Sequence, residues 1–208
     1  LHAVNGKKIS KEMAAQEACE IEIDILKEPI GKQDQYAAAY GGLNVITFNT
    51  DGTVSVEPVF MDFKFKSKLE NHMMLFFTGI TRAASTVLDE QKKKIDENFE
   101  TYKKMSDSVL VFRDKLVAED LKGMAEMLHE GWQRKKSLAS GVTTSVTDTL
   151  YECAIKNGAW GGKILGAGGG GCLLFMAPPE SQQKIQTALE DLSKKHSLED
   201  FKRVHFGL

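Results

Sequence analysis

The chain has 208 residues, of which 42% are apolar and 27% charged, so it can bury a sizeable core in one large domain or two small ones. This composition argues against intrinsic disorder. The formal net charge is −2 with both signs interspersed, which argues against a nucleic-acid partner or an anionic membrane surface. The longest apolar runs, 172–177 and 73–77, are far shorter than the ~20 residues of a membrane-spanning helix.

The cysteines indicate the compartment. Cys19, Cys153 and Cys172 are too few and too scattered for a disulfide framework, and none lies in a CxxC or Cys/His cluster. We therefore expect a reducing, cytoplasmic setting. The opening segment at Leu1 does not resemble a signal peptide, and we expect the chain to begin inside a domain.

The first part of the chain predicts helices followed by a hairpin. Ser10 can cap a helix that runs to about Leu26, with an apolar stripe at helical spacing as its core face: Ala14, Ala18, Ile21 and Ile25. A second helix is expected over 36–40 and ends at Gly41-Gly42. Strands over 43–48 and 53–59 flank the turn sequence Asn49-Thr50-Asp51-Gly52, which predicts a β-hairpin.

The remainder predicts a mixed helix and sheet region. Phe63 and Phe65 alternate with lysines as in a half-buried strand, and 73–78 reads as a buried strand. Residues 82–158 predict three or four amphipathic helices, with breaks near Ser106, 119–120 and Gly141. The remaining expected elements are strands at 163–165 and 172–177, a helix at 181–195 and a last strand at 203–206. The order predicts an α+β fold with helices against an antiparallel sheet and a boundary between two lobes near 60–70.

A dense group of glycines between two expected strands is the strongest local signal. Eight of the 18 glycines lie between Gly158 and Gly171. Residues without Cβ permit positive φ and close approach to a ligand, and their N–H groups can cradle an anion. A tight turn with a glycine bulge is the alternative, but it needs only one or two glycines. We therefore favour ligand contact.

Two carboxylates are candidates for chemistry in the first part of the chain. Asp34 can accept a proton from a substrate hydroxyl, with Lys32 nearby to offset charge. An aspartate at a helix start is also a common helix cap, and this alternative stays open. Glu22 lies at the edge of the apolar stripe and can bind Mg²⁺, although a glutamate on such a helix is usually only solvated.

Cations supply candidate binding groups. Arg82 follows an expected buried strand and can hold a substrate phosphate or carboxylate, with bonding to neighbouring carbonyls as the equal alternative. Lys32 and Lys135 are weaker candidates for a phosphate. The cations at 134–136 are more simply explained by the helix dipole or by solvation.

Three segments together resemble GHMP small-molecule kinases. They are 29–44 (PIGKQDQYAAAYGGLN), 78–82 (TGITR) and 163–172 (KILGAGGGGC). The resemblance covers essentially the whole chain in order and is strongest to the branch that phosphorylates the anomeric hydroxyl of D-glycero-D-manno-heptose 7-phosphate.

The resemblance implies a fold and a set of roles. The implied fold has an N-terminal lobe like ribosomal protein S5 domain 2 over 1–66 and a ferredoxin-like C-terminal lobe over 67–208. The implied reaction is ATP-dependent phosphorylation of a sugar hydroxyl for nucleotide-activated heptose synthesis, with Asp34 as base and Glu22, seven residues before Pro29, as the magnesium ligand. The implied roles also place the ATP phosphates at Gly166, Gly168, Gly169, Gly170 and Gly171, with substrate at Arg82, Gly41 and Gly42.

One family motif is missing from these residues. The phosphate-binding Pro-x-x-x-Gly-Leu-Gly-Ser-Ser-Ala segment does not occur in 1–208, and by the resemblance it precedes Leu1 in a longer kinase. We then expect residues 1–208 alone to be inactive. A fucose- or mannose-type sugar kinase and a noncatalytic ligand-binding module remain open alternatives, and the oligomeric state, including a homodimer, is left open.

Overall fold

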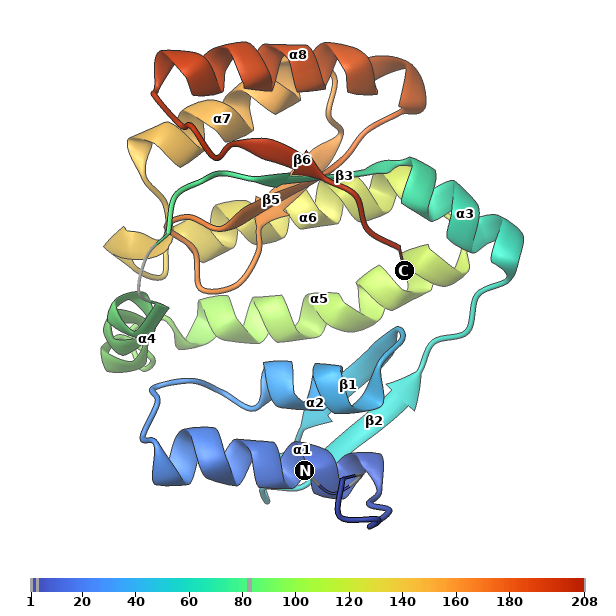
Figure 1. Ribbon diagram of the computed structural model, residues 1–208, viewed down its shortest axis with the longest axis vertical. Coiled ribbons are helices and arrows are strands. Elements are labelled where there is room, and N and C mark those ends of the chain that lie inside the picture. Colours follow the sequence, from blue (N-terminus) through green and yellow to red (C-terminus); the bar gives the residue numbers. More distant parts are fainter. Residues whose placement is uncertain (1, 3, 82–83, 208) are drawn as a thin grey trace. The chain divides into compact units, whose positions relative to one another are not determined.

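The computed structural model describes residues 2, 4–81 and 84–207, which divide into two compact units, residues 1–60 (unit 1) and 61–208 (unit 2). Each unit is described by itself. Figure 1 labels the elements of both. Unit 1 contains, in chain order, α1 (Lys11–Cys19), the π-helix η1 (Glu20–Ile25), α2 (Gln33–Tyr40), β1 (Asn44–Phe48) and β2 (Val54–Pro58).

Helix α1 begins where the sequence predicts. The Met13 amide donates to Ser10 Oγ at 3.1 Å, so Ser10 is the N-cap. The expected core stripe is wrong, because Ile21 and Ile25 are 48% and 65% exposed. The buried face instead carries Ala15 and Cys19, which pack on Tyr36.

The error has a physical cause in the second half of the helix. After Cys19 the backbone bonds switch to the wider i→i+5 spacing of a π-helix, which changes the angular step between residues. The periodicity of 3.6 therefore fails for residues 20–25. Packing against α2 then selects the face of Ala15 and Cys19, one residue away from the predicted stripe.

The predicted hairpin is confirmed. Strands β1 and β2 pair antiparallel in the register Asn44↔Pro58 to Phe48↔Val54. The turn is closed by the Asn49 amide on Thr53 O at 2.9 Å and by the Gly52 amide on Asn49 O at 3.0 Å. Gly52 has φ +88°, a conformation that favours glycine.

Unit 2 is built on an antiparallel four-stranded sheet. Its elements are α3 (Phe63–Asn71), β3 (Met73–Phe77), α4 (Ala84–Lys93), α5 (Phe99–Val117), α6 (Leu121–Lys136), the 3₁₀-helix η2 (Ser140–Val142), α7 (Ser145–Lys156), β4 (Gly161–Ile164), β5 (Cys172–Met176), α8 (Pro179–Lys195) and β6 (Lys202–Val204). The strand order is β4-β5-β3-β6 with every pair antiparallel. With several helices between β3 and β4 and one between β5 and β6, this is the predicted ferredoxin-like arrangement, and the α+β class is confirmed.

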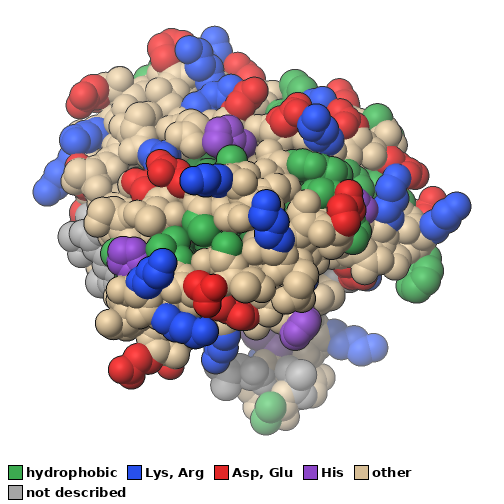
Figure 2. Space-filling view, turned by 90° about the horizontal axis from the view of Figure 1, so that it is seen from above, with side chains coloured by type: hydrophobic (Ala, Val, Ile, Leu, Met, Phe, Trp, Pro, Cys, Tyr) green, Lys and Arg blue, Asp and Glu red, His purple; other side chains and the backbone are tan. Residues whose placement is uncertain are grey.

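The helices of unit 2 enclose one apolar core. In Figure 1, α7 and α8 lie above the sheet and α5 below it. The buried cluster includes Phe76 and Phe175 from the sheet, Trp132 from α6, Tyr151 from α7 and Ile185 from α8. The outer face seen in Figure 2 interleaves basic and acidic side chains. None of the described helices is both long and apolar enough to cross a membrane.

Three predicted details of unit 2 are wrong. The segment that contains Phe63 and Phe65 is the helix α3, because Asp62 caps its start: Asp62 Oδ1 accepts the Phe65 amide at 2.7 Å. The buried residues of this helix, Phe65 and Leu69, are four positions apart, as one helix face requires. Helix α5 continues through Ser106 without a break. The last strand is Lys202–Val204, since its register is set by pairing with β3.

The edge strand β4 approaches α6 so closely that a side chain is excluded. A Cβ on Gly161 would lie 1.9 Å from Ala125 O of α6. By contrast, a Cβ on Gly131, also in α6, would meet nothing within 4 Å. The closeness of α6 and β4 therefore depends on glycine at 161.

We expect Gly161→Ala to lower the free energy of unfolding by about 1–3 kcal/mol, because α6 must move away from β4. Gly131→Ala is the matched control and should raise it by about 0.5–1 kcal/mol, because alanine is the better helix former. Urea unfolding of both variants measures this. Equal effects of the two substitutions would show that the close approach is not needed.

Helix α4 is tied to η2 by a carboxylate. Glu90 Oε1 accepts the Ser140 amide at 3.1 Å, and its Oε2 accepts the Ser140 hydroxyl at 3.0 Å. Lys94 Nζ also donates to Glu90, at 3.0 Å. The Ser140 amide, then Lys94 and the Ser140 hydroxyl, hold the pKa of Glu90 at about 2.

We expect Glu90→Gln to lower stability at pH 7, and the difference from the parent to shrink with acid. A depressed folded-state pKa contributes stability above the unfolded value of 4.5, and that contribution is lost as pH falls toward about 2. Urea unfolding from pH 7 to pH 3 measures the narrowing gap. A gap that stays constant over this range would contradict the role of the carboxylate.

Candidate functional site

Three predicted site residues of unit 1 surround the start of α2. Lys32 is the N-cap residue, and Asp34 lies in the first helical turn, exposed to solvent. The next residue, Gln35, is 6% exposed, and its Nε2 donates to Glu22 Oε2 at 2.6 Å. The structure therefore joins Glu22 to the residue that follows Asp34 in α2.

The carboxylate of Glu22 is bonded to a residue of α2. Glu22 lies in the π-helix η1, and Gln35 of α2 donates to one of its carboxylate oxygens. Gln35 Oε1 is buried without a hydrogen-bond partner. No group of three or more His, Cys, Asp or Glu side chains forms a metal-binding cluster within the described part of the chain. Glu22 thus offers a single carboxylate to a cation.

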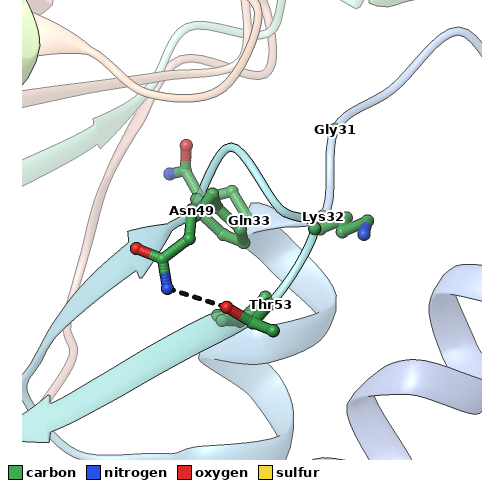
Figure 3. A pocket seen from close by; sticks show the side chains of 8 residues that line it. Gly31, Lys32, Gln33, Asn49 and Thr53 are labelled. Carbon is green, nitrogen blue, oxygen red and sulfur yellow. Dashed lines mark hydrogen bonds between the residues drawn. The ribbon is translucent and has the colours of Figure 1, made fainter.

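A pocket of about 400 Å³ lies between the start of α2 and the hairpin turn. Figure 3 shows Gln33, Asn49 and Thr53 at this pocket, with Asn49 Nδ2 donating to Thr53 Oγ1 at 3.0 Å. The Lys32 side chain points away from that pair in Figure 3. The amide and hydroxyl groups at this pocket are bonded within the hairpin, since Thr53 Oγ1 in turn donates to Asp51 Oδ1 at 2.6 Å. Sequence reasoning did not identify the pocket, because hairpin-turn residues are usually explained by the turn itself.

The glycines Gly41 and Gly42 end α2. Both have positive φ, +63° and +69°, and the Gly41 amide donates to Ala37 O at 3.0 Å, so a helix end explains glycine here. Both also line a second pocket of about 400 Å³ in unit 1, where an added Cβ would meet nothing. Their assignment to substrate binding stays a prediction.

The glycine loop between β4 and β5 is held by backbone hydrogen bonds to two other loops. The Gly169 amide donates to Val142 O of η2 at 2.7 Å, and the Gly171 amide donates to Ile80 O at 2.8 Å. Gly171 O accepts both the amide and the hydroxyl of the buried Thr78, at 2.9 and 2.8 Å. The loop is therefore a fixed part of unit 2.

Some of the glycines are required by packing within the chain. A Cβ on Gly168 would lie 2.4 Å from Val142 O, and one on Gly170 would lie 2.5 Å from Ile80 O. Sequence reasoning attributed such close approach to a ligand, whereas here it is to the chain's own backbone. Gly166 and Gly171 instead face open space and have φ of +68° and +78°.

Two lysines accompany this loop. Lys135, in the last turn of α6, donates from Nζ to Gly166 O. Lys163, on β4, lies near enough that its charge disfavours protonation of Lys135. Sequence reasoning gave Lys135 a minor role and missed Lys163. The sequence carried no signal for Lys163, because its place on the strand face that meets α6, two residues after Gly161, depends on tertiary packing.

Arg82, the remaining predicted substrate-binding residue, lies outside the described residues. The described residues just before it, Thr78 and Ile80, hold the end of the glycine loop. The binding role of Arg82 stays a prediction.

Comparison with known proteins supplies the family. Residues 112–195 match the family described as GHMP kinases C terminal. The chain is similar to the D-glycero-alpha-D-manno-heptose 7-phosphate kinase of Campylobacter jejuni, with 33% identity over 177 residues, covering 84% of this chain and 52% of that protein. It thus spans about half the length of this relative.

Solved structures agree in fold. The chain is similar to a crystal structure of a D-glycero-D-manno-heptose 1-phosphate kinase from Bacteroides thetaiotaomicron, with 26% identity and a TM-score of 0.68 over 97% of this chain and 54% of that one. A Lactococcus lactis galactokinase complexed with galactose shares the fold, with a TM-score of 0.75 at 17% identity, over 100% of this chain and 62% of that one. With the family match over 112–195, these findings show that the chain carries a GHMP kinase C-terminal domain.

Proposed function

We propose that this chain is part of an ATP-dependent sugar kinase that phosphorylates the anomeric hydroxyl of a sugar or sugar phosphate. The observation that carries the proposal is the hydrogen bond that joins Glu22 to Gln35, the residue that follows Asp34 at the start of α2. Phosphoryl transfer needs a group that positions or deprotonates the hydroxyl and groups that offset phosphate charge. One carboxylate can position or deprotonate the hydroxyl, and the other can hold a cation that offsets phosphate charge.

Asp34 is the proposed base. It is exposed in the first turn of α2, where a substrate hydroxyl can reach it. The aspartate carboxylate accepts a proton from the hydroxyl as the hydroxyl oxygen forms its bond to the γ-phosphorus of ATP. The bond from that phosphorus to the bridging oxygen breaks, and ADP leaves. Lys32, the preceding cap residue, offsets negative charge near the reacting groups.

Glu22 is the proposed magnesium ligand. Mg²⁺ in kinases is commonly held by one or two carboxylates together with substrate phosphates, and the single carboxylate here fits that pattern. The hydrogen bond from Gln35 Nε2 orients one oxygen of the Glu22 carboxylate. When bound, Mg²⁺ neutralises charge on the transferring phosphate.

The glycine loop is the proposed contact for ATP phosphates. Gly166 and Gly171 are open to a ligand, while the bonds of Gly169 and Gly171 to Val142 and Ile80 fix the loop in place beforehand. A fixed loop loses little conformational freedom on binding. This favours Gly166 as the point of contact and makes Gly168, Gly169, Gly170 and Gly171 mainly supporting residues, because the Gly171 amide and carbonyl are already bonded to Ile80 and Thr78.

The proposed substrate is D-glycero-D-manno-heptose 7-phosphate, phosphorylated in the cytoplasm. The support is the similarity to the C. jejuni heptose 7-phosphate kinase over 84% of this chain. A fucose-type kinase is the second candidate, because the chain also matches a Bacteroides fragilis L-fucokinase/L-fucose-1-P guanylyltransferase at 25% identity over 170 residues.

We expect Asp34→Asn, in the protein that contains this chain, to lower kcat by about 10²–10⁴-fold, because asparagine cannot accept the hydroxyl proton. The assay measures ADP release with ATP and Mg²⁺ on heptose 7-phosphate, mannose, fucose and galactose. Asp24→Asn is the matched control, because Asp24 is an exposed carboxylate on η1. Its kcat should equal that of the parent.

Two results would contradict the proposal. Unchanged kcat in Asp34→Asn would show that Asp34 is not the base. Absence of turnover by the parent on every sugar would leave a ligand-binding module instead of a kinase.

A further inference from the structure

Lys135 and Lys163 form a pair of cations beside the glycine loop of unit 2. The Lys135 ammonium donates to Gly166 O, the first carbonyl of the run 166–171. Lys163 stands on β4, three residues before Gly166. Both side chains are partly buried, which is unusual for lysine.

The geometry of α6 and β4 brings the two ammonium groups together. A Cβ on Gly161 would touch Ala125 and His129 of α6, so this face of β4 meets α6, and Lys163 lies on the same face two residues on. Ten helical residues from Ala125 to Lys135 advance about 15 Å, and five extended residues from Gly161 to Gly166 advance roughly the same distance. Helix and strand therefore run side by side up to the loop.

The charge of this pair is not balanced within the described part of the chain. Neither ammonium forms an ion pair with a carboxylate of the described residues, although seven other lysine and arginine side chains there do. Lys136, the neighbour of Lys135, pairs with Asp148 at 3.4 Å. Two partly buried cations without a counter-ion are costly in the absence of a ligand.

The protonation behaviour agrees with this geometry. Burial, followed by the charge of Lys163, lowers the pKa of Lys135 to about 8. Burial also lowers the pKa of Lys163. The lowered pKa of Lys135 thus has burial as its main cause and a second ammonium close by as the next one.

We propose that Lys135 and Lys163, with the open backbone at Gly166, bind a phosphate group carried by a substrate. A phosphate monoester carries a charge of about −1.5 to −2 at pH 7, which matches two ammonium ions. Its oxygens accept charge-assisted hydrogen bonds from both lysines. Which substrate carries the phosphate, a sugar phosphate or ATP, rests on the proposed function, whereas phosphate binding itself does not.

The first experiment titrates inorganic phosphate into the protein by calorimetry. We expect the double variant Lys135→Gln/Lys163→Gln to bind at least about tenfold more weakly than the parent, because two charge-assisted contacts are lost. The control is Lys122→Gln/Lys184→Gln, which removes the same charge from exposed positions on α6 and α8. The control should bind like the parent.

The second experiment needs no variant and remains valid if the double variant fails to fold. The parent is labelled with acetic anhydride with and without inorganic phosphate, and acetylation of each lysine is measured by mass spectrometry. We expect phosphate to protect Lys135 and Lys163 by at least threefold and to leave Lys122 and Lys184 unprotected. Equal labelling of all four lysines with and without phosphate would overturn the proposal.

Comparison of two ligands identifies the carrier. Binding of heptose 7-phosphate and of ADP is measured in the parent, the double variant and the control. A loss confined to the sugar phosphate assigns the site to the substrate's own phosphate, and a loss confined to ADP assigns it to the nucleotide. Undiminished binding of inorganic phosphate and of both ligands by a folded double variant would overturn the proposal. Phosphate binding without kinase turnover would contradict the proposed function but would still agree with a phosphate site at Lys135 and Lys163.

Discussion

The backbone hydrogen bonds of the glycine loop are the constraint on which the proposed site in unit 2 depends. Gly169 and Gly171 donate to Val142 and Ile80, so the loop is joined to η2 and to the segment after β3. Each of these bonds satisfies a backbone group that would otherwise be costly to bury. Any ligand at Gly166 therefore meets a surface that the fold has already formed.

The helices around the glycine loop are connected to the same hydrogen bonds. Val142 belongs to η2, and η2 is tied to α4 through Glu90 and Ser140. Helix α6 reaches the loop from the other direction through Lys135, and its course is set by the close approach to Gly161. The position of one loop thus depends on residues far apart in the sequence.

The sequence predicted the parts of the fold that depend on local chemistry. The Ser10 cap, the hairpin turn at 49–52 and the buried strand at 73–77 were predicted correctly, because each follows from neighbouring residues. The core face of α1 was predicted wrongly, because a π-helix breaks the period of 3.6 after Cys19. The region of Phe63 was predicted wrongly because the Asp62 cap outweighs the alternation of Phe and Lys.

The residues of the candidate site could be predicted from the sequence, but the hydrogen bonds and packing contacts that hold them in place could not. The motifs identified Glu22, Asp34 and the glycines, whereas the bond from Gln35 to Glu22 and the packing of Gly168 on Val142 require tertiary structure. The lysine pair was also hidden, since Lys135 and Lys163 are 28 positions apart and meet only when α6 lies along β4.

Amide hydrogen exchange within the glycine loop tests the central claim most directly. If the fold holds the loop in place before any ligand binds, the Gly169 and Gly171 amides should exchange at least about a hundredfold more slowly than the amide of Gly166, as measured by NMR on the ligand-free protein. Equally fast exchange of all three amides would contradict the account, because it would show that the loop is ordered only by what it binds.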